Sequence, residues 1–210
     1  MSFPTHILRS KEYPKYSQHL EELPEDDKYS RFLSVMTAKS IEKYVAKIQE
    51  NPEEIVIAHY NNSLNIDAAV QLSIIEMYRE WVLRRIAELS ISIHPESRGK
   101  WMGDELFKRA LLHLKAWKKA EQVVIICSPS NQAMIKLAQR NGMKVTGNYE
   151  EKNAELSLWK TEPGIISYDL WLQLEGNHDL RIKKTVDLIS KNWEAQQAVF
   201  GFIKRVWMIN

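Results

Sequence analysis

The sequence predicts an α/β fold of the α+β type, with a mixed, mostly antiparallel central sheet flanked by helices and a C-terminal helix after it. Three strand-like segments with short links follow one another between residues 55 and 93. A helical segment then leads into the apolar run VVIIC at 123–127. Short links join antiparallel strands, whereas a helical crossover makes the strands on either side of it parallel neighbours.

The N-terminal third is expected to be partly irregular. Residues 1–28 are polar and rich in Pro and Glu, which predicts one short strand at 5–9 and then irregular chain. A short helix is expected over 29–36. Thr37 is typical of a helix N-cap, and apolar residues recur behind it at helical spacing. This pattern predicts a helix over 38–50 that ends at Asn51-Pro52.

The remaining elements follow from alternating and helical periodicity. We expect strands at 55–60, 66–78 and 84–93, a helix at 102–120, a strand at 123–127, a helix at 131–141 and a hairpin of 143–149 with 154–159. The continuous apolar run at 123–127 favours a strand that is buried on both faces. We expect one domain over 1–160 and a helical extension over 161–210.

Composition excludes several classes of protein. The single cysteine, Cys127, rules out an internal disulfide framework, and the histidines lack metal-ligand spacing, so no metal is expected. A net charge of +2 gives no argument for nucleic-acid binding. The sequence has no apolar run long enough to span a membrane and no signal-peptide core, so a cytoplasmic protein is expected.

A basic, glycine-bearing turn, RGKWMG at 98–103, stands between a strand and a helix. Two interpretations of it remain open. The free N–H groups of the turn and of the first helical residues are suited to a phosphate group. Alternatively, Gly99 and Gly103 only permit a tight connection.

This turn and the helix after the next strand carry a resemblance. The turn is similar to an Arg/Gln-x-x-Gly-x-Gly/Ala motif through Arg98 and Gly103, although Trp101 replaces its middle glycine. Residues 131–143 are similar to Asn-x-x-Ala-x-x-Leu-Tyr-x-x-x-Gly-Phe through Asn131, Leu137 and Gly142. Both motifs belong to the GNAT superfamily of N-acetyltransferases, which the sequence resembles over about 30–160.

The variant Asn-x-x-Met-x-x-Leu-Ala looks like that of the protein-lysine acetyltransferase members of the superfamily. The segment with Arg31-Phe32 and the helix over 38–50 are also similar to the N-terminal region of those members.

The resemblance implies acetyl-CoA as cosubstrate. It implies that the backbone of the strand over 84–93 pairs with the pantetheine arm and that the turn at 98–103 holds the pyrophosphate. It also implies that Asn131, a candidate N-cap as well, lies near the coenzyme. The expected coenzyme-binding residues are Ile91, Ser92, Ile93, Arg98, Gly99, Lys100, Trp101, Met102, Gly103 and Asn131. Ala138 occupies the place of the usual general-acid tyrosine. Tyr149 and Tyr168 are possible substitutes, and nothing in the sequence chooses between them.

Transfer to an amine requires a base. A lysine-like amine has a pKa near 10.4, so only about 0.04 % of it is neutral at pH 7. Glu88 is the candidate general base because it lies on the strand that leads into the turn, where the lysine acetyltransferase relatives place a catalytic glutamate. The alternatives for Glu88 are a solvent-facing carboxylate or an ion-pair partner of Arg84 or Arg85.

The expected reaction is direct ternary-complex transfer of acetyl to a primary amine of a small polyamine-like molecule or of a protein lysine. Asp26, Asp27 and Glu42 are candidates to attract a cationic acceptor. Two other classes remain open, a non-catalytic acyl-CoA-binding regulatory module and a helix-mediated interaction protein. In the extension, positions 182, 186, 189, 193, 196, 200, 203 and 207 form a heptad-like seam, which favours packing on the domain or pairing with a second copy as a homodimer.

Overall fold

The computed structural model describes residues 3–79, 82–99, 101–117, 119–158 and 164–207, and of Arg79 and residues 194–207 it describes the backbone alone. Its helices and strands, in chain order, are β1 (His6–Ile7), α1 (Tyr13–Glu21), α2 (Glu25–Phe32), α3 (Ala38–Glu50), β2 (Glu54–Tyr60), β3 (Ile66–Arg79), β4 (Val82–Ile93), α4 (Met102–Ala116), β5 (Gln122–Cys127), α5 (Gln132–Arg140), β6 (Lys144–Gly147), β7 (Lys152–Ser157) and α6 (Ile165–Trp207). Short 3-10 turns precede α1 and follow β4.

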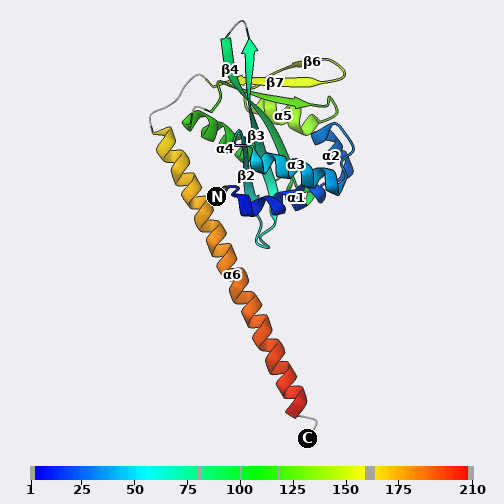
Figure 1. The fold of residues 1–210 in the computed structure, drawn as a ribbon, viewed down its shortest axis with the longest axis vertical. Coiled ribbons are helices and arrows are strands. Elements are labelled where there is room, and N and C mark those ends of the chain that lie inside the picture. The colour runs from blue at the N-terminus through cyan, green and yellow to red at the C-terminus, as the bar shows by residue number, and fades with distance from the viewer. Residues whose placement is uncertain (1–2, 80–81, 100, 118, 159–163, 208–210) are drawn as a thin grey trace.

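The strands form a sheet of order β1-β2-β3-β4-β5-β7-β6 (Figure 1). Strands β2, β3 and β4 make an antiparallel meander, and β5, β7 and β6 are joined by antiparallel pairing as well. Strands β4 and β5 are parallel, because α4 connects them as a crossover. The predicted mixed, mostly antiparallel sheet with flanking helices is therefore confirmed.

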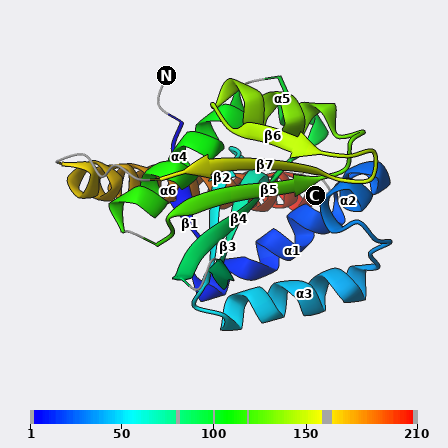
Figure 2. The ribbon, with the colours of Figure 1, turned by 90° about the horizontal axis from the view of Figure 1, so that it is seen from above.

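Helices cover both faces of the sheet, with α4 and α5 on one face and α1 and α3 on the other (Figure 2). The alternation of side chains along β2 shows how the two cores are separated. Ile55 and Ile57 are buried against the α4 side, whereas Val56 and Ala58 are buried against α1 and α3.

The helix over 38–50 is confirmed, including its cap, because the Thr37 side chain accepts a hydrogen bond from the Ser40 N–H at 3.2 Å. The short N-terminal strand is confirmed as β1, but the irregular chain expected after it is wrong, since 13–21 is the helix α1, whose buried face includes Tyr16 and Leu20. The next helix covers 25–32 rather than 29–36, because the three acidic residues after Pro24 favour its first turn.

The expectation that β5 is buried on both faces is also wrong. Val123, Ile125 and Cys127 are buried, but Ile126 is 42 % exposed. The strand is thus buried on one face only, because burial alternates along it.

Helix α6 is 43 residues long, and only its first part packs on the domain (Figure 1). Its main anchor is Asp169, which is fully buried. One carboxylate oxygen is paired with Arg109 of α4, and the other accepts hydrogen bonds from Trp117 at 2.8 Å, Gln173 at 2.6 Å and His113 at 3.2 Å. None of the described helices is long and apolar enough to cross a membrane.

Burial alone would raise the pKa of Asp169. Hydrogen bonds from His113 and Trp117 and the charge of Arg109 outweigh burial, so the pKa lies well below its usual range. The carboxylate therefore stabilises the fold above the pKa of about 4 that an aspartate has in an unfolded chain, and this contribution is lost as pH falls toward the depressed value.

We expect Asp169→Asn to lower the free energy of unfolding at pH 7 by about 3–5 kcal/mol, because it leaves the Arg109 charge buried without its partner. Chemical denaturation at pH 7 and pH 4 measures this, and the deficit of the variant shrinks at the lower pH. Asp187→Asn, which removes the partly exposed pair with Lys191, is the control and costs less than about 1 kcal/mol. Equal losses in both variants would contradict the assignment.

Candidate active site

The central feature of the site is the separation of β4 from β5. Their parallel pairing covers only three residue pairs, the last of which joins Glu88 to Val124. Beyond this pair, β4 continues to Ile93 and β5 to Cys127, and the two strands line a cavity of about 650 Å³. Ile126 lines this cavity, on the opposite face of β5 from the buried Val123, Ile125 and Cys127.

The backbone of β4 offers hydrogen-bonding groups to the cavity. On the β5 side the Arg85 carbonyl accepts from the Glu121 N–H, and on the β3 side the His94 N–H donates to the Asp67 carbonyl. Because backbone direction alternates along a strand, the groups that point toward the cavity beyond the last β4–β5 pair are the Leu89 C=O and the N–H and C=O of Ile91. An extended ligand with amide groups can pair with them as an additional strand.

The turn after β4 continues the same cavity. Gly99 has φ +74° and Trp101 has φ +62°, both in the left-handed region, and α4 begins at Met102. The first intrahelical bond runs from the Glu105 N–H to the Trp101 carbonyl, so the N–H groups of residues 102–104 have no helical partner. Residues 102–104 line the cavity, which fits an anionic group at this helix end.

Trp101 preserves the backbone shape that a glycine would adopt at this point. A non-glycine residue in the left-handed region costs about 1–2 kcal/mol. The residue is 71 % exposed, so most of the indole lies outside the cavity although its edge contributes to the lining.

A buried polar cluster of Asp67, Ser97 and His59 holds the start of the turn in place. The Asp67 carboxylate accepts a hydrogen bond from the Ser97 hydroxyl at 3.0 Å and contacts His59 Nδ1 at 2.6 Å. Burial acts to raise the pKa of Asp67, but the hydrogen bond from His59 and its charge lower it overall. Asp67 stands between the other two residues, so they form no serine–histidine nucleophile pair, and the cluster positions the turn.

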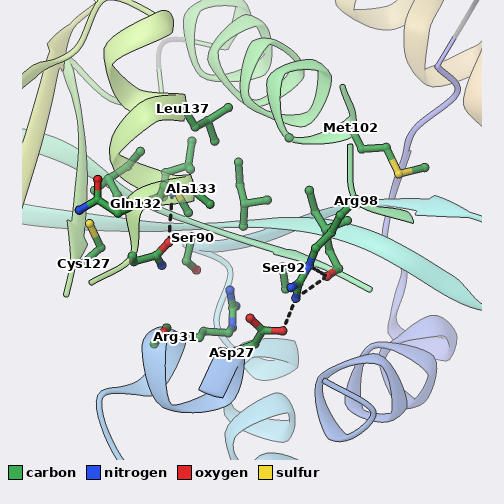
Figure 3. Close-up of a pocket in the computed structure, with 18 of the residues that line it drawn as sticks. Asp27, Arg31, Ser90, Ser92, Arg98, Met102, Cys127, Gln132, Ala133 and Leu137 are labelled. Carbon is green, nitrogen blue, oxygen red and sulfur yellow. Dashed lines mark hydrogen bonds and ion pairs between the residues drawn. The ribbon is translucent and has the colours of Figure 1, made fainter. Parts of the chain in front are cut away.

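Arg98 connects the turn to helix α2. Its guanidinium is paired with Asp27, and its Nε lies 3.4 Å from the Ile93 carbonyl oxygen (Figure 3). Asp27 therefore neutralises a cation of the protein itself. Asp26 and Glu42, the other expected attractants of a cation, are exposed and do not line the cavity.

Helix α5 forms the opposite wall. The Asn131 side chain accepts a hydrogen bond from the Met134 N–H at 3.1 Å, which confirms its role as N-cap, and Asn131 also lines the cavity. A Cβ atom at Gly103 would lie 3.5 Å from Ile93 Cδ1 and 3.6 Å from Leu137 Cδ1. Alanine thus fits at Gly103, and anything larger meets the cavity wall.

The structure brings together all the expected coenzyme-binding residues that it describes, since each of them lines this cavity. Lys100 lies outside the described residues. Glu88 is half-buried on the last β4–β5 pair, one residue before the lining begins. It shares a strand face with Ser90 and Ser92, which do line the cavity.

Sequence reasoning missed His19 because it treated this segment as irregular. His19 is buried, with Nδ1 2.9 Å from the Ile66 carbonyl and Nε2 2.9 Å from the Ser92 hydroxyl. Burial lowers the pKa of His19 to about 4, so the ring is neutral at pH 7. Nδ1–H therefore donates to the carbonyl, and Nε2 accepts from Ser92.

No tyrosine occurs among the described residues that line the cavity. Ala138 is buried in the core, Tyr149 is fully exposed and Tyr168 stacks on Trp171 of α6. Cys127 is buried as expected but also touches the cavity, and burial raises the pKa of its thiol. Within the described ranges, no group of three or more His, Cys, Asp or Glu residues is placed to hold a metal ion.

Comparisons with solved structures agree with this geometry. The fold is similar to the GNAT domain of PAT from S. lividans, with a TM-score of 0.60 and 15% identity over 73% of this chain and 89% of that one. For the spermidine N-acetyltransferase from Vibrio cholerae, solved with CoA and spermine, the TM-score is 0.58 and the identity 17% over 76% and 99% of the two chains. For a GNAT-family acetyltransferase from Streptococcus pneumoniae, the values are 0.56 and 17% over 73% and 99%.

These identities are low, so the structural likeness concerns the fold alone. No curated protein matches the sequence. The family model of the acetyltransferase (GNAT) domain, however, matches residues 8–144, which is more than half of the chain. The protein therefore belongs to the GNAT acetyltransferase family.

Proposed function

We propose that the protein transfers an acetyl group from acetyl-CoA directly to a primary amine in a ternary complex, with Glu88 as general base. The observation that carries this proposal is the cavity between β4 and β5, which runs from the last paired residues to the N-terminus of α4. Acetyl-CoA supplies an acetyl group activated as a thioester. The residues of the chain bind and orient the two substrates and accept a proton.

The residues present fit such a coenzyme. The Leu89 C=O and the N–H and C=O of Ile91 point toward the cavity, as a linear arm with amide groups requires. The free N–H groups at 102–104 fit the diphosphate, because the helix N-terminus carries partial positive charge. Gly99 and Trp101 shape the backbone around it.

We expect Gly103→Glu to weaken acetyl-CoA binding by about 100-fold or more, because its carboxylate would meet the diphosphate charge at short range. Isothermal titration calorimetry measures the affinity, and circular dichroism shows that the variant is folded. Gly103→Ala is the matched control, since its Cβ makes ordinary contacts and leaves the affinity within a few fold. An unchanged affinity for acetyl-CoA in Gly103→Glu would refute the proposed diphosphate site at the N-terminus of α4.

Glu88 is proposed to take the proton from the acceptor amine through a water molecule. It lies where β4 and β5 separate, on the face that carries Ser90 and Ser92, and one residue outside the lining. An ion pair of Glu88 with Arg84 or Arg85 is another interpretation of this residue. Both arginines have other partners, since Arg84 contacts Glu121 and Arg85 contacts Glu53.

Glu88→Gln is expected to lower kcat/KM for the amine by about 10²–10⁴, which is the usual contribution of a general base. The affinity for acetyl-CoA should not change. Release of free CoA thiol measures the rate, and Glu76→Gln, at an exposed position of β3, is the control. A loss of less than about threefold in Glu88→Gln would show that another group is the base.

The acceptor is proposed to be a primary amine of a small polyamine-like molecule or of a protein lysine, in the cytoplasm. The V. cholerae neighbour is by name a spermidine acetyltransferase, which supports an amine acceptor. The absence of a tyrosine from the described lining keeps a second function open, that of a non-catalytic acyl-CoA-binding module. Binding of acetyl-CoA without thiol release on any member of an amine panel would favour that module.

We also propose that the distal part of α6 pairs with the same helix of a second copy. Ile182, Val186, Ile189 and Trp193 are each at least 50 % exposed and follow the 4–3 spacing of a heptad seam. A seam of this kind is buried when two copies associate. A V. cholerae spermidine acetyltransferase is described as dodecameric, so assembly occurs within this fold.

The double substitution Val186→Glu and Ile189→Glu is expected to convert a dimer into a monomer, because it places charges in the seam. Light scattering of the full chain gives the mass. Leu188→Glu, at a position that is equally exposed but off the seam, is the control and should leave the dimer intact. A wild-type mass of one chain would refute the homodimer.

A further inference from the structure

Arg31 occupies an unusual position in the cavity wall. It comes from α2, lines the cavity together with Asp27 and Ser30, and extends toward Ser90 (Figure 3). Ser90 lies two residues beyond Glu88, on the same face of β4. The guanidinium is therefore on the same side of the cavity as Ser90, toward the proposed base.

Only one nitrogen of the Arg31 guanidinium is engaged. Nη2 donates to the Tyr16 hydroxyl at 2.7 Å and to Gln71 Oε1 at 2.7 Å. Nε and Nη1 are buried from solvent and have no hydrogen-bond partner among the described residues. A guanidinium has five N–H donors, so the two on Nη1 and the one on Nε have no acceptor among the described residues.

The two partners of Arg31 hold it in place without neutralising it. Burial raises the pKa of Tyr16, so its hydroxyl stays protonated, and Gln71 is a neutral amide. Gln71 is itself fixed, because its Oε1 also accepts from Tyr44 at 2.9 Å and its Nε2 donates to Glu54 at 2.9 Å. The nearest carboxylate in this hydrogen-bond network, that of Glu54, therefore contacts Gln71 and not Arg31.

No carboxylate forms an ion pair with Arg31 in the described part of the chain. Asp27, one turn earlier on α2, is engaged by Arg98. The ring of Phe32 lies 5.5 Å from Arg31 Cζ, which supports the cation but accepts none of the free N–H groups. Buried donors without a partner are especially costly on a charged group, and hydrogen bonds to an anionic ligand would recover this cost.

We propose that Arg31 binds a carboxylate of the acceptor, so that the acceptor is an amine that also carries a carboxylate group. This inference rests on the proposed transfer to a primary amine, and it replaces the polyamine-like acceptor with an amino carboxylate. A carboxylate on Arg31 would orient the acceptor with its amine toward the base side of the cavity. A polyamine would instead place a cation beside an uncompensated cation, which is unfavourable where water is excluded.

The experiment compares the binding of matched probes to the full chain by calorimetry, with and without CoA. The probes are ω-amino carboxylates of two to six carbons, their uncharged amides, and spermidine. The wild type is expected to bind the best carboxylate at least about tenfold more tightly than its amide and more tightly than spermidine, as a charge-assisted hydrogen bond requires.

Arg31→Gln should abolish this preference, so that the carboxylate and its amide bind about equally well. Arg31→Lys should retain part of the preference because the charge is kept. The acetyl-CoA affinity should stay within about twofold in both variants, which also shows that they are folded. Arg181→Gln, at an exposed position of α6, is the control and should keep the full preference.

The inference is overturned if the carboxylates bind the wild type no better than the amides, if no probe binds, or if spermidine binds best. It is also overturned if Arg31→Gln weakens acetyl-CoA itself as much as it weakens the carboxylate, because Arg31 would then serve the coenzyme. If the wild type does not bind CoA, the proposed function is refuted instead. The ratio of carboxylate to amide binding, measured without CoA, then still tests whether Arg31 binds a carboxylate.

Discussion

The parting of β4 from β5 is the constraint on which the rest of this structure depends. Two strands that stop pairing in mid-sheet leave backbone donors and acceptors facing each other across a gap, which is costly without a ligand or water. The arrangement holds because each strand is fully paired on its other side. β4 is in register with β3 along its entire length, and β5 is in register with β7 from Gln122 to Cys127. The sheet thus consists of two coherent halves joined by only three residue pairs.

The turn between β4 and α4 is held from two directions by carboxylates, which explains how a strained loop keeps one shape. The Asp67 carboxylate fixes its beginning through the Ser97 hydroxyl, and the Asp27 carboxylate is paired with Arg98. These two contacts span 30 and 71 positions of the chain. The charge of Arg98 is therefore already shared with α2, so the proposed binding of a diphosphate would rest mainly on backbone N–H groups.

The sequence predicted the elements whose signals are local, and it failed where the decisive partner is distant. The Thr37 cap and the meander of β2, β3 and β4 depend on neighbouring residues and were predicted correctly. Helix α1 was missed because two of its buried residues are tyrosines in a polar segment that contains a proline. Strand β5 looks buried on both faces because its apolar run includes Ile126, which lies on the less covered face of the strand. His19 is held by partners 47 and 73 positions away, and Arg31 by Tyr16 and by Gln71, which is 40 positions away.

The two departures from the family motifs have different consequences, because the fold uses different atoms at the two positions. At Trp101 the fold uses the main chain. The backbone takes the left-handed conformation and the side chain is mostly exposed, so the turn keeps its shape at a cost in strain. At Ala138 the family pattern supplies a hydroxyl, and no backbone arrangement replaces it; the alanine is simply part of the core. The lost hydroxyl thus concerns the leaving-group side of the proposed reaction. On the proposed acceptor side, the chain has Glu88, the buried pair of His19 and Ser92, and the Arg31 guanidinium, two of whose nitrogens have no partner among the described residues.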